Sequence, residues 1–201
     1  MVKKFKLLII IFCLAISFSL ISNTYSRYVA SSEGNVEVSF AKWEILVNNT
    51  DITNNTSSNI TFNPTIEHNS NVADGKIAPS STGYFDVHID PSNVDVSFKY
   101  RIDLDIDSED IPDLMITKYA ILDNNYSVGD TLTYNTLTNG YIENTVNYNN
   151  SLQPFTVRVF FEWYEGENES MNDADDSTIA SNSNNQSFTI NANIKFEQVI
   201  N

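Results

Sequence analysis

The stretch VDVSFKYRIDLDID, residues 94–107, decides the fold class of this chain. Every second residue in it is apolar, and the residues between them are polar or charged. The apolar members are Val94, Val96, Phe98, Tyr100, Ile102, Leu104 and Ile106. Successive side chains of a β-strand point to opposite faces of the sheet. A period of two over this length therefore predicts a long strand with one buried face and one wet face.

Other segments alternate in the same way. Clear patterns predict strands at residues 84–89, 155–163 and 188–197, and weaker patterns predict strands at 60–66, 114–122 and 131–137. Asp90-Pro91-Ser92-Asn93 predicts a turn, and Asn139-Gly140 is typical of a hairpin. The polar stretches 48–59 and 165–186 are expected to be loops. Because each strand has one apolar face, we expect an all-β fold, an antiparallel sandwich of jelly-roll or Greek-key type.

Residues 36–47 also alternate, but the alternation changes phase within the segment. The apolar side chains stand first at even positions and then at odd ones: Val36, Val38 and Phe40, then Trp43, Ile45 and Val47. A straight strand cannot place both sets on one face. We expect a bulge or a bend near Ala41-Lys42, and we expect the segment to belong to the sandwich from Val36 onward.

The start of the chain has the pattern of a secretory signal. Lys3, Lys4 and Lys6 precede an apolar run, residues 7–21, which only two serines interrupt. At about 1.5 Å per residue, this run spans roughly 22 Å as a helix. The hydrocarbon core of a bilayer measures roughly 30 Å. We therefore expect an N-terminal signal helix that is cleaved, rather than a retained anchor, and a secreted product with no stable membrane insertion.

Cysteine usage and charge exclude several kinds of function. The single cysteine, Cys13, lies in the apolar run, so the exported chain would have no disulfide, no thiolate nucleophile and no cysteine metal site. The full chain has a formal charge of −15, and removal of the three leader lysines leaves 8 basic against 26 acidic residues, or −18. Nucleic-acid binding depends on neutralising phosphates, so we expect no nucleic-acid partner.

The histidines and aspartates give no pattern typical of catalysis. There are two histidines, His68 and His88, and no zinc-binding His-Glu-x-x-His pattern. His88 shares a predicted strand face with Asp86 and Asp90, which is either a trio of metal ligands or a solvated face. The aspartates at 103, 105 and 107 alternate with apolar residues, which favours a strand over a calcium loop. We expect neither an enzyme nor a cofactor.

The acidic stretch 165–176 contains the weak Ca²⁺ candidates. Asp173, Asp175 and Asp176 supply the oxygen ligands that Ca²⁺ prefers. An EF-hand loop that starts at Asp173 would need glycine at position 178, where this chain has threonine. We therefore expect a solvated acidic loop at this position and no metal site.

Three segments together resemble a known family. They are TYSRY followed by GNVEVSFAKWEI (residues 24–28 and 34–45), KIAPSSTGYFDVHID (76–90) and FTINANIKFEQVI (188–200). This order is similar to the TasA/camelysin family of biofilm-matrix proteins of Gram-positive bacteria, whose signal peptides are processed by a dedicated SipW-type signal peptidase. The matching residues of the middle segment are Pro79, Gly83 and Phe85. Ser80 departs from the family pattern, which has glycine after the proline.

The resemblance implies a processing site and a compartment. Cleavage between Ser26 and Arg27 would give a signal peptide of residues 1–26 and a single β-sandwich domain of residues 27–201, with cleavage after Thr24 as an alternative. The family usually has Tyr-Ala where this chain has Tyr25-Ser26. A signal peptidase would be the partner during export. The exported domain would lie at the cell surface or in the extracellular matrix.

Two function classes follow, and sequence does not separate them. The first is a structural protein that self-associates or binds other matrix proteins, with Val36, Val38 and Phe40 on a strand that pairs with a sheet edge of the next subunit. The alternative is a monomeric extracellular module that binds a cell-wall glycan or Ca²⁺. Aromatic side chains on polar faces, Tyr84, Phe160 and Tyr164, would then be its stacking platforms.

Overall fold

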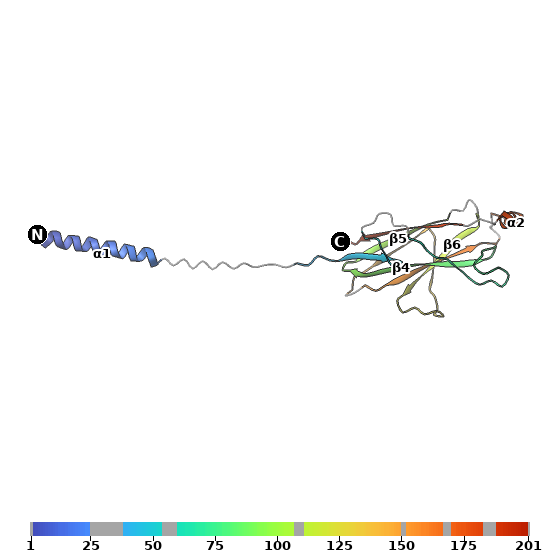
Figure 1. The fold of residues 1–201 in the computed structure, drawn as a ribbon, viewed down its shortest axis with the longest axis horizontal. Coiled ribbons are helices and arrows are strands. Elements are labelled where there is room, and N and C mark those ends of the chain that lie inside the picture. Colours follow the sequence, from blue (N-terminus) through green and yellow to red (C-terminus); the bar gives the residue numbers. More distant parts are fainter. Residues whose placement is uncertain are drawn as a thin grey trace. The chain divides into compact units, whose positions relative to one another are not determined.

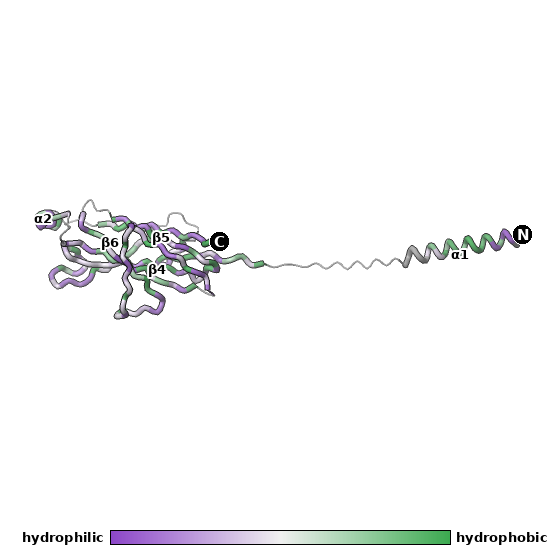
Figure 2. Tube along the Cα trace, turned by 180° about the vertical axis from the view of Figure 1, so that it is seen from behind, coloured by the Kyte–Doolittle hydropathy of each residue, from purple (hydrophilic) through white to green (hydrophobic). Residues whose placement is uncertain are grey.

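The computed structural model describes residues 2–24, 38–53, 60–106, 111–149, 152–166, 170–182 and 188–200. The chain divides into two units, Met1–Ser39 and Phe40–Asn201. The first unit contains helix α1 (Val2–Thr24), whose described side chains are all exposed. Figure 2 shows that most of this helix is hydrophobic, with a hydrophilic start. Within the described residues, no helix has both the length and the hydropathy needed to cross a membrane.

The second unit contains two antiparallel sheets (Figure 1). The larger sheet has the order β2-β1-β4-β9-β6-β7, and β3 also pairs with β4. Its strands are β1 (Trp43–Val47), β2 (Thr50–Asp51), β3 (Thr65–Ile66), β4 (Thr82–Val94), β6 (Leu114–Asp123), β7 (Tyr134–Thr136) and β9 (Phe155–Trp163). The smaller sheet has the order β10-β5-β8, with β5 (Phe98–Ile106), β8 (Tyr141–Val146) and β10 (Ile190–Gln198). A short helix, α2 (Asp173–Asn182), precedes β10.

One apolar core lies between the two sheets. The inward side chains that the sequence pattern identified are buried in it, on strands of both sheets: Ile45, Val47, Phe85, Val87, Ile89, Phe98, Tyr100, Ile102, Val157, Val159 and Phe161. Side chains of β10 pack against the same cluster and are half-buried. The prediction of an all-β fold with two antiparallel sheets is therefore confirmed at this level.

The alternating stretch of residues 94–106 is divided between the two sheets. The predicted turn at residues 90–93 is wrong, because β4 continues to Val94. Glu44 pairs with Asn93 and Leu46 with Asp90, so Pro91 and Ser92 form a bulge opposite a single β1 residue. A bulge is one of the few places where a strand tolerates proline. The chain then crosses at residues 95–97, and Val94 and Phe98 are both buried because each faces the shared core.

Several weaker predictions were also wrong. Asn139-Gly140 joins β7 of the larger sheet to β8 of the smaller one, so it is a crossover and not a hairpin, although Gly140 does have the positive φ of +70° that such turns use. Of the predicted strands at 60–66 and 131–137, only the short β3 and β7 form. Strand β8 was missed because only one of its side chains, Ile142, is buried.

Candidate functional site

The chain joins the sandwich at Lys42. The backbone N–H of Lys42 donates to Asp95 Oδ2 at 2.9 Å, and its carbonyl accepts from the N–H of Asp95 at 3.0 Å. The preceding apolar residues are exposed, Phe40 to 95% and Val38 to 74%, and residues 38–42 form no strand. The expectation that the segment belongs to the sandwich from Val36 onward is therefore wrong for residues 38–41. Val36 and the predicted cleavage pair, Ser26 and Arg27, lie outside the described residues.

The phase change explains this boundary. Trp43, Ile45 and Val47 occupy the inward positions of β1, so the preceding even set would point away from the core if the strand continued straight. The strand β1 therefore begins only at Trp43, after the phase change. Two apolar side chains are thereby left uncovered directly before the sheet.

Three chain segments meet at the turn between β4 and β5. Lys42 contacts Asp95 in this turn, Val199 N–H donates to the carbonyl of Ser97 at 3.0 Å, and Tyr148 N–H donates to the Ser97 hydroxyl at 2.9 Å. Each segment carries exposed apolar side chains, namely Phe40, Tyr148, Val199 and Ile200. This end of the sandwich thus presents apolar surface of the kind that interfaces use.

Strand β10 forms a long edge of the smaller sheet. Its nine residues pair with β5, and no other described strand pairs with it. The remaining outer strands are shorter: β2 and β3 have two residues each, β7 has three and β8 has six. Phe196 holds β10 on the core, with its ring 5.9 Å from Phe98 and 6.4 Å from Tyr100. An unpaired edge of this length is a template for another extended segment.

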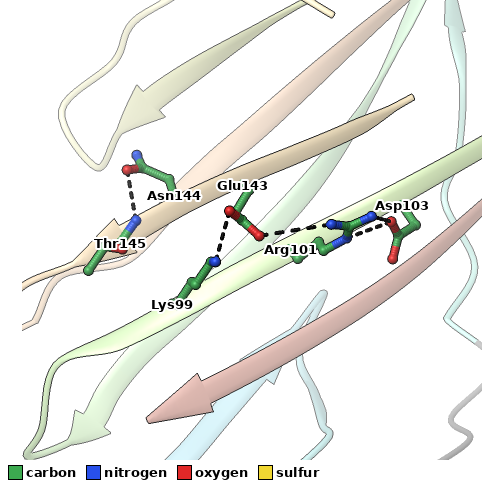
Figure 3. Close-up of polar contacts among 6 residues, drawn as sticks. All are labelled: Lys99, Arg101, Asp103, Glu143, Asn144 and Thr145. Atoms are coloured by element: carbon green, nitrogen blue, oxygen red, sulfur yellow. Dashed lines mark hydrogen bonds and ion pairs between the residues drawn. The ribbon is translucent and has the colours of Figure 1, made fainter. Parts of the chain in front are cut away.

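Charged side chains cover the outer face of the smaller sheet (Figure 3). Arg101 contacts Asp103 at 2.6 Å and Glu143 at 4.0 Å, and Lys99 contacts Glu143 at 2.8 Å. Lys195 of β10 reaches Asp103 at 3.6 Å. The hydrogen bond from Arg101 holds the pKa of Asp103 below its usual value. These contacts place Asp103 in an ion-paired network on this face, whereas Asp105 is exposed and Asp107 lies outside the described residues.

The Ca²⁺ candidates begin a helix, so the loop predicted for them is wrong. Asp173, Asp175 and Asp176 occupy the first turn of α2, where carboxylates interact favourably with the helix dipole. Asn172 caps the helix, because its Oδ1 accepts from the N–H groups of Ala174 and Asp175 at 3.0 and 3.3 Å. Burial raises the pKa of Asp176. No group of three or more His, Cys, Asp or Glu side chains placed to hold a metal occurs in the described part of the chain.

A buried carboxylate that the sequence did not suggest positions this region. Asp113 is only 4% exposed, and its two oxygens accept from the N–H groups of Ser170 and Met171 at 2.6 and 2.8 Å. Nothing in the local pattern Ile-Pro-Asp-Leu distinguishes it from a solvated turn residue, because its partners lie more than fifty positions away.

The histidine trio does not converge on a common point. His88 Nδ1 lies 3.2 Å from the Thr156 hydroxyl, and Asp86 forms a bidentate pair with Arg158, with both contacts at 2.8 Å. Asp90 accepts from Ser92 in the bulge. The three side chains therefore have separate partners.

The aromatic platforms of the binding-module alternative are partly covered. Phe160 is buried in a second small cluster on the outer face of the larger sheet, and the Tyr134 ring lies 5.3 Å from it. Arg158 lies over the Tyr84 ring at 4.0 Å. Tyr164 is half-buried. This packing explains why the otherwise polar outer face of β9 carries the apolar Phe160.

Comparisons of the chain with family models, curated proteins and solved structures found no match.

Proposed function

We propose that this chain is a secreted structural protein of the cell surface or extracellular matrix. In this proposal its sandwich is of jelly-roll type, and its copies assemble through the segment before β1. The observation that carries the proposal is the uncovered apolar pair, Val38 and Phe40, directly before the point where Lys42 anchors the chain. Burial of an exposed apolar side chain such as Phe40 against a partner would stabilise the complex.

The partner surface in this proposal is the β10 edge of another copy. An added strand would extend the smaller sheet through backbone hydrogen bonds, which give affinity without a dedicated pocket. Residues 36, 38 and 40 alternate with polar residues, so one face of the added strand is apolar. That face would continue the layer formed by Ile190, Ala192, Ile194 and Phe196, all half-buried on β10.

The segment that resembles the TasA/camelysin family supports the proposal on physical grounds. Ser80 stands where the family has glycine, and it adopts φ of +67°. This left-handed conformation favours glycine over residues with a Cβ atom. Gly83, a matching residue, has no room for a side chain, because a Cβ there would lie 2.5 Å from the Phe161 ring and 2.9 Å from the Thr65 carbonyl. The backbone conformation at position 80 and the lack of space at position 83 both favour glycine, which is the residue that the family pattern has at these positions.

Charge would regulate this assembly. Cleaved copies with a formal charge near −18 repel one another, and the repulsion falls with added salt or with protonation of carboxylates. Assembly would then depend on the solution around the cell as well as on protein concentration.

Electron microscopy of two chains tests the proposal. The first chain comprises residues 27–201 and the second lacks residues 27–40, while both retain Lys42 and every strand. We expect fibres or oligomers from the first chain and monomers from the second. Equal assembly by the two chains would refute the proposed role of the segment.

A further inference from the structure

A cavity of about 850 Å³ opens beside α2. In Figure 1, α2 and the C-terminus lie at opposite ends of the sandwich, so this cavity is remote from the end where Val199 contacts the β4–β5 turn. Its walls come from the residues around β3, from the turn that precedes β4, from the end of β9, from α2 and from the start of β10. Its volume is within the range of pockets that enclose small ligands.

The lining becomes more polar from the base to the mouth. The base contains the buried side chains of Phe85, Ile111 and Trp163. Half-buried side chains such as Phe62 and Ile179 form the walls, and the Phe62 ring packs 5.6 Å from Phe85. The exposed mouth carries the polar side chains. A ligand that fits this gradient has an apolar body and a polar end.

The mouth has a positive charge, although the chain is strongly acidic. Lys76 is the one charged side chain among the lining residues, and Thr189 adds a hydroxyl. Lys76 is exposed, and its ammonium forms no ion pair with a described residue. The nearby carboxylate of Asp74 contacts His68 at 3.4 Å instead. An anionic head group at this mouth would gain a charged partner while remaining solvated, which avoids the cost of burying a charge.

We propose that this cavity binds a single-chain amphiphile with an anionic head group, of the class of long-chain carboxylic acids. The hydrocarbon chain lies on Trp163, Phe85 and Ile111, and the carboxylate lies at Lys76. The cavity does not involve the segment before β1, because none of its lining residues lies before residue 62, and Ile190 is the one β10 residue that it shares with the proposed assembly edge.

Calorimetric titration of residues 40–201 tests the proposal. This unit contains both sheets and all of the described core, and it lacks the segment before Phe40. The probes are decanoate, dodecanoate and dodecyltrimethylammonium, each below its micelle concentration. We expect one site per chain, an affinity gain of about 4-fold per added methylene, and weaker binding of the cationic probe than of dodecanoate.

Two variants localise the site. Ala78→Trp places an indole in the wall and is expected to reduce the affinity for dodecanoate more than 10-fold. Lys76→Gln is expected to reduce it about 2- to 5-fold while leaving the cationic probe unaffected or improved, because the lost ion pair is an exposed one. Circular dichroism confirms that each variant is folded, and Lys76→Gln changes only an exposed side chain.

Three outcomes would overturn the proposal. They are no saturable binding to the unsubstituted chain, equal binding of the anionic and cationic probes, and concentration-dependent self-association that Ala78→Trp abolishes. The last outcome would assign the cavity to a second copy. Failure of residues 27–201 to form fibres would bear on the proposed function and not on this cavity.

Discussion

Substitution of Phe40 by aspartate should weaken assembly without weakening the fold. Phe40 is 95% exposed, so its loss should change the free energy of unfolding by no more than about 0.5 kcal/mol. Complete burial of a phenylalanine side chain contributes about 1.5–3 kcal/mol. If the segment buries Phe40 against another copy, the association constant should fall by roughly 10- to 150-fold.

The assay is the critical concentration for assembly of residues 27–201, measured by sedimentation. Val128→Asp is the matched control, because Val128 is 97% exposed and the substitution adds the same charge. Urea unfolding of both variants checks the fold. An unchanged critical concentration for Phe40→Asp, or an equal rise for Val128→Asp, would refute burial of Phe40 in the assembly.

Four further results are expected. Burial raises the pKa of Tyr100 to about 12 from 10.0, so the stability that it contributes is present below pH 10 and falls as pH rises toward 12. Between pH 9 and pH 11.5 this loss is about 2 kcal/mol, and Tyr100→Phe should remove it in urea titrations at those two pH values. Asp113→Asn should lower the free energy of unfolding by about 1–3 kcal/mol, since an amide oxygen cannot replace both carboxylate acceptors; an unchanged urea midpoint would contradict the hydrogen bonds. Ser80→Gly should be about 1 kcal/mol more stable than Ser80→Ala, the reverse of the usual order, because φ is +67°; a more stable alanine variant would exclude that conformation. Assembly should strengthen between pH 7 and about 4.5 as carboxylates near pKa ~4 are protonated, and light scattering that depends on neither pH nor salt would count against regulation by charge.

The strand interiors could be predicted from sequence because a period of two depends only on which face is buried. The inward residues of β1, β4, β5 and β9 are the ones that the alternation identified. The same signal did not show where the chain changes sheets. Val94 and Phe98 both face the shared core, so the alternation continues across the crossover at 95–97 as if it were one strand.

Features that depend on distant partners were not predictable. The bulge at Pro91 exists because β1 pairs there, and no local pattern encodes that pairing. Asp113 depends on Ser170 and Met171 in the same way. Helix α2 was missed for a local reason, since an acidic, polar stretch was assigned to a loop although Asn172 and three aspartates form a regular helix start.

The candidate site was predicted only in part. The phase change near Ala41 did mark a structural boundary, but the segment before it is exposed where a built strand was expected. The edge of β10 needs the sheet order, which alternation does not contain.

Hydrogen exchange along β10 tests whether a strand of another copy adds to this edge. In an antiparallel pair, successive amides point alternately toward the partner strand and away from it. Half of the β10 amides therefore bond to β5, and the others point to the open edge. In assembled residues 27–201, we expect the outward amides of residues 190–198 to become protected, while in the chain lacking residues 27–40 they exchange rapidly. Assembly that leaves these outward amides unprotected would contradict strand addition at β10.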